Sequence, residues 1–470
     1  MSDTGPGDHP DVARLIAQLG EVPAFPERRP IHREISEEER NYLEGLGFSD
    51  SGRPLQDIVE DLTGPVLPNS MNMAHPRSFG FIPSAPLAAA WLIDAIVSAY
   101  NPFSGSWLQG SGPATIELAT IDILRRQVGL PETAGGVFLS GGSIANMTAL
   151  TAARTSRLGE DEWPDAIAYV TAEAHSSVRK GLRFIGVPDA NVRTVAADGE
   201  GRMVPGSLKE AIEEDLGEGR RPFAVTATFG TTNTGAIDPI AEIAAVASRY
   251  GVWLHVDGAY GATIAFSAHH RDLARDLQFA DSLSWDPHKW LFQTYVSSCL
   301  LVRDRRSLLD SFGTQADYLR DAEADPRKPN YWDYGPEMTR PARAVRLWAT
   351  LQVLGRRDLA AAIDHCVRLA EVAADRLGGM PDWRVTSSPQ LGILTFRYAP
   401  EGCPDDALDA VNAAISRAVF ESGFAVVLTT RLNGRTVLRL CTSNPNTTRE
   451  HVLETIERLD AAAKGAISRG

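Results

Sequence analysis

The sequence has few cysteines, no long apolar run and no excess of basic side chains. Its four cysteines lie far apart and form no CxxC pair, which argues against a disulfide framework, and we expect buried, reduced thiols at Cys299, Cys366, Cys403 and Cys441. No stretch of about 18 uninterrupted apolar residues occurs, and the N-terminus lacks a basic start followed by an apolar run. We therefore predict a cytoplasmic protein without a membrane span.

Acidic side chains outnumber basic ones, 60 to 46, which gives a formal net charge of −14. This charge disfavours general attraction to nucleic acid or anionic lipid, so we expect neither as a partner, and any phosphate group must be bound locally. Hydrophobic residues make up 43% of the 470 residues. Because one core rarely grows beyond about 250–300 residues, we expect a large domain with one or two smaller ones.

The middle of the chain alternates short apolar runs with helical patterns. The runs are GGVFLS, AIAYVTA, FAVTATFG, GVWLHVD, DSLSWD and SSCLLVRD. Runs that are apolar on both faces indicate strands covered on both sides. The alternation predicts an α/β fold with a mostly parallel, doubly wound sheet, whose binding crevice lies at the carboxyl ends of the strands.

Three regions follow from the composition. Residues 1–85 have short helical patterns broken by proline, which is typical of an arm that packs on a partner subunit. Residues 86–345 form the expected large domain. Residues 346–470 form a smaller α+β domain. Two helices within 341–378, which are separated by a Gly-Arg-Arg break, precede its strands.

Two charged residues follow apolar strands in ways that indicate chemistry. Lys289 stands in SWDPHKWLF, where burial among aromatic residues would lower its pKa and make the amine a nucleophile toward an aldehyde. Asp257 ends the strand GVWLHVD, and a carboxylate there can keep a pyridine nitrogen protonated, with small Ala259 leaving room for a flat ring. The structural alternatives are a surface lysine and an aspartate that caps a turn.

Further polar residues follow neighbouring strands. In LSGGSIANM, Gly142 and Ser143 open a helix whose N–H groups can bind a phosphate, and the spacing matches neither a dinucleotide nor an ATP motif. His175 in EAHSSV is placed either to lie on a cofactor ring or to cap a helix. The set at these strand ends is completed by Thr231, Thr232 and Asp238.

These motifs together resemble one family over nearly the whole chain. HPRSFGFIP, the Gly-Gly-Ser turn, EAHSSV, FGTT, HVDGAYG, DPHKWL and RPARAVRLW occur in the order found in the group II pyridoxal-phosphate decarboxylases, which include aromatic-L-amino-acid, histidine and glutamate decarboxylases. The resemblance implies a fold type I enzyme that uses pyridoxal 5'-phosphate to decarboxylate an L-amino acid. It also implies a homodimer with sites at the subunit interface.

The resemblance also implies a role for each motif residue. Lys289 would hold the cofactor as a Schiff base, Asp257 would pair with the pyridine nitrogen, and His175 would stack on the ring. The phosphate would lie at Gly142, Ser143 and His288, and Thr232 and Ala259 would flank the ring. Many family members have Asn three residues before the lysine, whereas this chain has Asp286. Since a carboxylate repels phosphate, that family contact is not carried over.

The same resemblance predicts a mobile loop after the lysine, in which Tyr318 protonates Cα. It places Phe81, Ile82 and Trp107 at the side-chain pocket, where they favour an aromatic substrate; core packing is the alternative for them. Aliphatic, basic and acidic substrates stay open, as do an oxidative reaction that yields an aldehyde and a lyase that cleaves Cα–Cβ. Tyr318 and His175 argue against the oxidative reaction, and the intact Lys289 argues against a cofactor-free relative.

Overall fold

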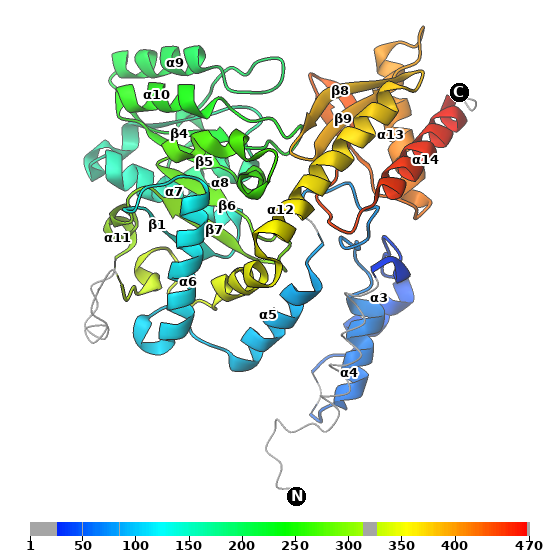
Figure 1. The fold of residues 1–470 in the computed structure, drawn as a ribbon, viewed down its shortest axis with the longest axis horizontal. Coiled ribbons are helices and arrows are strands. Elements are labelled where there is room, and N and C mark those ends of the chain that lie inside the picture. The colour runs from blue at the N-terminus through cyan, green and yellow to red at the C-terminus, as the bar shows by residue number, and fades with distance from the viewer. Residues whose placement is uncertain (1–25, 49, 84, 314–326, 468–470) are drawn as a thin grey trace, which may run out of the picture.

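The protein is described by a computed structural model that covers residues 26–48, 50–83, 85–313 and 327–467. Two sheets form its two main bodies, and the long helix α12 (Arg343–Gly378) runs from one to the other (Figure 1). The N-terminal helices α3 (Glu37–Gly45) and α4 (Leu55–Asp61) project away from the large body (Figure 1). A short π-helical segment, Leu62–Val66, follows α4.

The larger sheet has seven strands in the order β1-β7-β6-β5-β4-β2-β3. Its strands are β1 (Gly135–Leu139), β2 (Ala166–Val170), β3 (Val192–Thr194), β4 (Arg221–Thr228), β5 (Trp253–Asp257), β6 (Ser282–Trp285) and β7 (Ser298–Val302). Only β7 is antiparallel to its neighbours, β1 and β6, and the other pairings are parallel. Strands β1, β2, β4, β5 and β6 therefore end at the same edge of the sheet.

Burial explains why these segments are strands. Every residue of β2, β5, β6 and β7 is buried, as expected for a sheet covered on both faces. The helices of this body are α5 (Ala88–Tyr100), α6 (Trp107–Gln127), α7 (Gly142–Arg157), α8 (Ser176–Phe184), α9 (Pro205–Gly217), α10 (Ile240–Tyr250) and α11 (Arg306–Phe312). Short 3-10 turns cover Glu160–Asp165, Gly261–Phe266, Arg271–Phe279 and Tyr331–Asp333. The predicted mostly parallel sheet is confirmed.

Local sequence signals set several helix boundaries. Ser36 caps α3 by accepting from the Glu39 N–H, and the Glu39 side chain accepts from the Ser36 N–H in return. Helix α10 ends at Gly251, whose φ of 68° lies in the left-handed region that glycine adopts without steric cost. These signals limit the helices before tertiary packing is considered.

The smaller sheet is antiparallel and has the order β10-β11-β9-β8. Its elements are β8 (Trp383–Gln390), β9 (Ile393–Tyr398), α13 (Asp405–Glu421), β10 (Leu428–Leu432), β11 (Arg435–Cys441) and α14 (Arg449–Ile467). The expected strand FAVVLTT begins later than predicted, because Val426 forms a parallel bridge with Ser78 instead. The Phe79 N–H donates to the Val426 carbonyl at 2.9 Å, so the N-terminal segment is attached beside this sheet.

Helix α12 belongs to both bodies. It kinks at Gly355, with φ 64° and ψ 179°, which is the predicted Gly-Arg-Arg break. Its Leu359 and Ile363 pack in the core of the large sheet, whereas Ala370 and Leu377 pack in the core of the small one. The domain limits 1–85, 86–345 and 346–470 stay a prediction, because this helix continues across the second boundary.

Three of the four thiols are buried, at Cys299, Cys366 and Cys441, and none of the four forms a disulfide. The expectation of burial is wrong for Cys403, which is exposed in the polar turn before α13. Within the described ranges, no helix combines the length and the apolar character needed to cross a bilayer.

Candidate active site

The carboxyl edge of the large sheet gathers the residues singled out from the sequence. Asp257 is the last residue of β5, and His175, Thr232 and Lys289 follow β2, β4 and β6. One cavity is lined by these four residues together with Ile82, Glu173, Thr228, Gly230, Ala259 and Tyr260. The parallel strand order places residues from distant parts of the chain around one small space.

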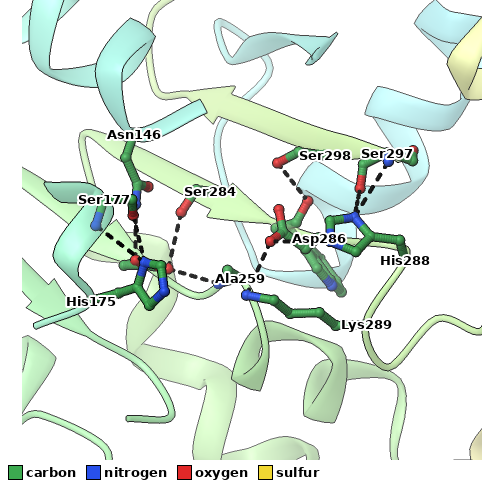
Figure 2. A network of polar contacts seen from close by, with 12 residues as sticks. Asn146, His175, Ser177, Ala259, Ser284, Asp286, His288, Lys289, Ser297 and Ser298 are labelled. Atoms are coloured by element: carbon green, nitrogen blue, oxygen red, sulfur yellow. Dashed lines mark hydrogen bonds and ion pairs between the residues drawn. The ribbon is translucent and has the colours of Figure 1, made fainter. Parts of the chain in front are cut away.

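Asp257 is almost completely buried and fully supplied with donors. Its Oδ2 accepts from the Asn146 amide at 2.9 Å, and its Oδ1 accepts from the Ala259 N–H at 3.1 Å and the Ser284 hydroxyl at 3.3 Å (Figure 2). Burial raises the pKa of Asp257, but the positive charge of Lys289 and the donors outweigh it, so the pKa is lowered. This carboxylate is ionised at neutral pH.

Lys289 reaches toward a second carboxylate. Its Nζ lies 3.1 Å from Oδ2 of Asp286, which is 1% exposed (Figure 2). Oδ1 of Asp286 is buried without a hydrogen-bond partner among the described residues. Lys289 therefore lies between two carboxylates, Asp286 and Asp257.

The prediction of a lowered pKa for Lys289 is wrong for this structure. Burial does lower the pKa, but the negative charges of Asp286 and Asp257 together raise it above the ordinary value of lysine. Its aromatic neighbour Trp290 stacks on Tyr260, with ring centroids 4.9 Å apart. The two carboxylates determine the charge of this amine.

The start of helix α7 approaches Asp286 closely. A Cβ at Gly142 would come 2.6 Å from Oδ2 of Asp286, so any larger residue would push this carboxylate away from the helix start. The first hydrogen bonds of the helix are made by the N–H groups of Ile144 and Ala145 to Gly141. The N–H groups of Gly142 and Ser143 precede these bonds, which is the arrangement of a helix-start phosphate site.

His175 caps helix α8, and its Nδ1 faces Ser177. That nitrogen accepts from the Ser177 N–H at 3.3 Å and lies 2.7 Å from the Ser177 hydroxyl (Figure 2). The residue is exposed and lines the cavity. The helix cap expected from the sequence is confirmed, and its position on a cofactor ring stays a prediction.

His288 lies near Asp286 rather than in the cavity of Lys289. Its Nδ1 donates to the Ser297 carbonyl at 2.6 Å, and its Nε2 is 3.9 Å from Oδ2 of Asp286. Burial lowers the pKa of His288, so its ring is neutral at neutral pH. The structure places it on the same side of Lys289 as the helix start.

Comparison with known proteins identifies the family. Residues 38–399 match the family model described as the pyridoxal-dependent decarboxylase conserved domain. The chain belongs to this family. It is a pyridoxal-phosphate-dependent amino-acid decarboxylase, as the motif resemblance predicted.

Relatives of this decarboxylase agree with the assignment. It is 36% identical over 417 residues to the aromatic-L-amino-acid decarboxylase of Bacillus atrophaeus, which covers 88% of this chain and 87% of the relative. It is 33% identical over 431 residues to the L-2,4-diaminobutyrate decarboxylase of Rhizobium meliloti (strain 1021), covering 90% and 86%. The crystal structure of Oryza sativa TDC with PLP and tryptamine superposes with a TM-score of 0.92 at 26% identity, covering 98% of this chain and 99% of that one.

The residues of the site fit the cofactor of this family. An amine, an ionised and buried carboxylate, and a helix start with unused N–H groups match an aldehyde, a pyridine nitrogen and a phosphate. Only Asp286 disagrees in charge, since its carboxylate lies at the helix start where a phosphate would bind.

The predicted substrate residues are not gathered in one place. Ile82 is buried and lines the cavity of Lys289, whereas Phe81 is 40% exposed and does not line it. Trp107 lines a different cavity beside Tyr331. Its backbone N–H donates to Oδ1 of Asn330 at 3.0 Å. Tyr318 lies outside the described residues.

Two further strand-end residues stabilise a turn instead of facing the cavity. Asp238 accepts from the N–H groups of Met203 and Thr228, and the Thr231 hydroxyl lies 3.0 Å from that of Thr234. These contacts hold the turn that presents Thr232 to the cavity.

Sequence reasoning missed Asn146, Ser177 and Glu173. Asn146 lies one helical turn after Gly142, so its spacing from the phosphate turn was a usable signal. Ser177 follows His175 by two residues, which is the spacing of a side-chain cap. Glu173 lines the cavity and accepts from the Asn233 amide at 2.9 Å, and nothing in its sequence context distinguishes it from a surface glutamate.

Proposed function

We propose that this enzyme decarboxylates an aromatic L-amino acid to the corresponding amine and carbon dioxide. The observation that carries the proposal is that Lys289, the ionised Asp257 and His175 line one cavity. When bound, pyridoxal phosphate supplies a ring that accepts the electrons released when a bond to Cα breaks.

We assign the protein groups as follows. Lys289 would bind the cofactor aldehyde and give it up to the substrate amine, Asp257 would keep the pyridine nitrogen protonated, and His175 would hold the ring from one face. Gly142, Ser143 and His288 would hold the phosphate, while Thr232 and Ala259 would fix the ring plane. Tyr318 would deliver the proton to Cα. Support comes from the shared cavity and from the match to the family motifs.

The central test replaces Lys289 by Ala. Turnover should fall at least about a thousandfold, and the visible absorbance of the lysine-bound cofactor should disappear. Retained activity would contradict the assignment. Peroxide and ammonia are measured on the wild-type enzyme in the same assay, because stoichiometric peroxide would instead support the oxidative reaction.

The cavity contains features that favour two substrate classes. Ile82 and Tyr260 provide apolar and aromatic surface for a flat side chain, as does the similarity to an aromatic decarboxylase. Glu173 favours a cationic side chain instead, such as that of a basic amino acid. We favour the aromatic class because the Glu173 carboxylate is already bonded to Asn233.

A competition assay with all common amino acids and 2,4-diaminobutyrate distinguishes the classes, with the amines identified by mass. We expect aromatic substrates to dominate and Glu173→Gln to change their kcat/KM by less than about threefold. Exclusive turnover of a basic amino acid, lost in the Glu173→Gln variant, would establish the second class.

We also propose that the enzyme is a homodimer. Leu92, Ile96 and Tyr100 are spaced four residues apart on α5 and are exposed, which gives this helix an uncovered apolar face. A second copy of the chain would cover it. Helices α3 and α4, which project away from the large body (Figure 1), would then contact the partner.

Light scattering after gel filtration tests this. A Leu92→Glu, Ile96→Glu double variant should be monomeric and inactive, because a charged residue in an apolar interface is strongly unfavourable. Leu216→Glu on α9, at the opposite end of the large body (Figure 1), is the control and should stay dimeric. A monomeric, active wild type would refute the dimer.

A further inference from the structure

A row of buried polar side chains lies behind the cavity and connects two of its walls. It consists of Trp253 and His255 on β5, Ser282 on β6, Asn146 on α7 and Ser177 on α8, each no more than 4% exposed. It branches at Asn146: one branch reaches Asp257, and the other reaches His175 through Ser177 (Figure 2). None of these five side chains lines the cavity of Lys289.

The first half of the row has a fixed donor direction. The Trp253 indole N–H can only donate, and it donates to the Ser282 hydroxyl at 2.8 Å. Nε2 of His255 lies 3.0 Å from the Asn146 amide oxygen, which can only accept, so the neutral ring carries its proton on Nε2. Nδ1 of His255 then accepts from the Ser282 hydroxyl, 2.9 Å away. Burial lowers the pKa of His255 to about 4, which agrees with a neutral ring.

The second half continues in the same direction. With its oxygen facing His255, Asn146 directs its two amide hydrogens to Asp257 at 2.9 Å and to the Ser177 hydroxyl at 3.0 Å. Asp257 fixes the same orientation independently, because a flipped amide would place its oxygen against a carboxylate. Because Nδ1 of His175 accepts from the Ser177 N–H, the Ser177 hydroxyl also points its hydrogen to this nitrogen.

We propose that Asn146 is a positioning residue that couples the two walls of the site, holding Asp257 as an acceptor-only carboxylate and holding the proton of His175 on Nε2. Nδ1 of His175 already accepts from the Ser177 N–H and hydroxyl, so a proton there would break the first bond and require the hydroxyl to turn. The Nε2–H of His175 is then the donor presented to the cavity. The proposal rests on the proposed function in that the cofactor lies between these two residues.

Two variants separate the two branches. Ser177→Ala removes the hydroxyl that links Asn146 to His175 and leaves the bond from Asn146 to Asp257. Asn146→Leu removes the bonds to both Asp257 and Ser177 with little change of volume. Asn412→Leu is the matched control, because Asn412 is equally buried and makes three hydrogen bonds, to Tyr398 and Leu408, far from the site in the small-sheet body.

Nitrogen-15 NMR of the histidine rings is the first measurement, with His175 assigned by comparison with His175→Gln. We expect the Nε2–H tautomer of His175 in the wild type and the Asn412→Leu control. In both Ser177→Ala and Asn146→Leu, we expect a mixture of the Nε2–H and Nδ1–H tautomers of His175. An Nδ1–H tautomer in the wild type would overturn the proposal, as would a His175 signal unchanged in both Ser177→Ala and Asn146→Leu.

The second measurement is the visible spectrum and turnover of the loaded enzyme. Asn146→Leu should shift the pH dependence of the cofactor spectrum and reduce kcat about a hundredfold, with KM changed less than about threefold. Ser177→Ala should reduce kcat about tenfold and leave the spectrum unchanged. A spectrum in Asn146→Leu identical to that of the control would refute the link to Asp257. The tautomer is independent of the substrate, so a wrong substrate assignment would leave that result intact.

Discussion

The two carboxylates that flank Lys289 differ in how completely the protein satisfies them. Asp257 accepts from Asn146, Ala259 and Ser284, and its pKa is lowered despite its burial. Asp286 pairs with Lys289 through one oxygen, and its other oxygen has no hydrogen-bond partner among the described residues. The protein therefore holds the Asp257 carboxylate in a fixed, fully hydrogen-bonded position. The negative charge of Asp286, at the start of α7, would instead repel a bound phosphate.

This difference separates two tasks. A preorganised carboxylate keeps the charge of a pyridine nitrogen fixed during the reaction, and no reorganisation is needed when the electrons move. An incompletely satisfied carboxylate at the helix start reduces the affinity for a dianion and stabilises the free lysine as a cation. We therefore expect substitutions at Asp257 to change turnover and substitutions at Asp286 to change cofactor affinity.

The largest effect is expected for Asp257→Asn. The amide keeps the shape but removes the charge, so kcat should fall about a thousandfold, which corresponds to about 4 kcal/mol. Stopped-flow assays at saturating cofactor measure it. Ser284→Ala, which removes only the 3.3 Å bond to the same carboxylate, should cost no more than about tenfold. Equal losses in the two variants would show that the charge is not the essential property.

The reactive residues at the strand ends could be predicted from the sequence. The residues that hold them in place from other elements could not. Lys289 and Asp257 follow recognisable apolar runs, and parallel strands bring such residues to one edge whatever the details of packing. Asn146 has the appearance of an ordinary helix residue, because its role depends on how α7 packs against β5. The raised pKa of Lys289 depends on which carboxylates face it. Trp107 lines another cavity at the start of α6, where its backbone N–H bonds to Asn330.

An intermediate effect is expected for the pH dependence of the free energy of unfolding. It tests the protonation of His255, which lies behind Asp257. The pKa of His255 is lowered from 6.5 to about 4 by burial. Between these values the unfolded chain binds a proton that the folded chain does not, so stability decreases as the pH falls from 6.5 toward 4. The loss from this residue reaches about 3 kcal/mol.

Urea unfolding at several pH values measures this loss in the wild type and in His255→Gln. Gln does not titrate, so the free energy of unfolding should depend less steeply on pH in the variant over this interval. His75, whose pKa burial also lowers to about 4, is present in both proteins and cancels in the difference. Identical slopes would mean that His255 is protonated in the folded protein, and the donor direction behind Asp257 would then be wrong.

The smallest effect is expected at the other carboxylate, with Asp286→Asn. The amide removes the repulsion of a phosphate at the start of α7 and can donate to it, so pyridoxal phosphate should bind about tenfold more tightly, which corresponds to about 1.4 kcal/mol. The pKa of Lys289 should fall in the same variant, because Asp286 is the first of the charges that raise it. Titration of the cofactor-free protein, followed by absorbance, gives the dissociation constant.

Pyridoxal, which lacks the phosphate, separates the two consequences of that substitution. If the repulsion acts on the phosphate, Asp286→Asn should strengthen the binding of pyridoxal phosphate but not that of pyridoxal. If the substitution acts only through the amine of Lys289, both ligands should change equally. Weaker binding of pyridoxal phosphate in the variant would show that Asp286 serves as a protonated phosphate ligand, and the two carboxylates would then differ in protonation rather than in preorganisation.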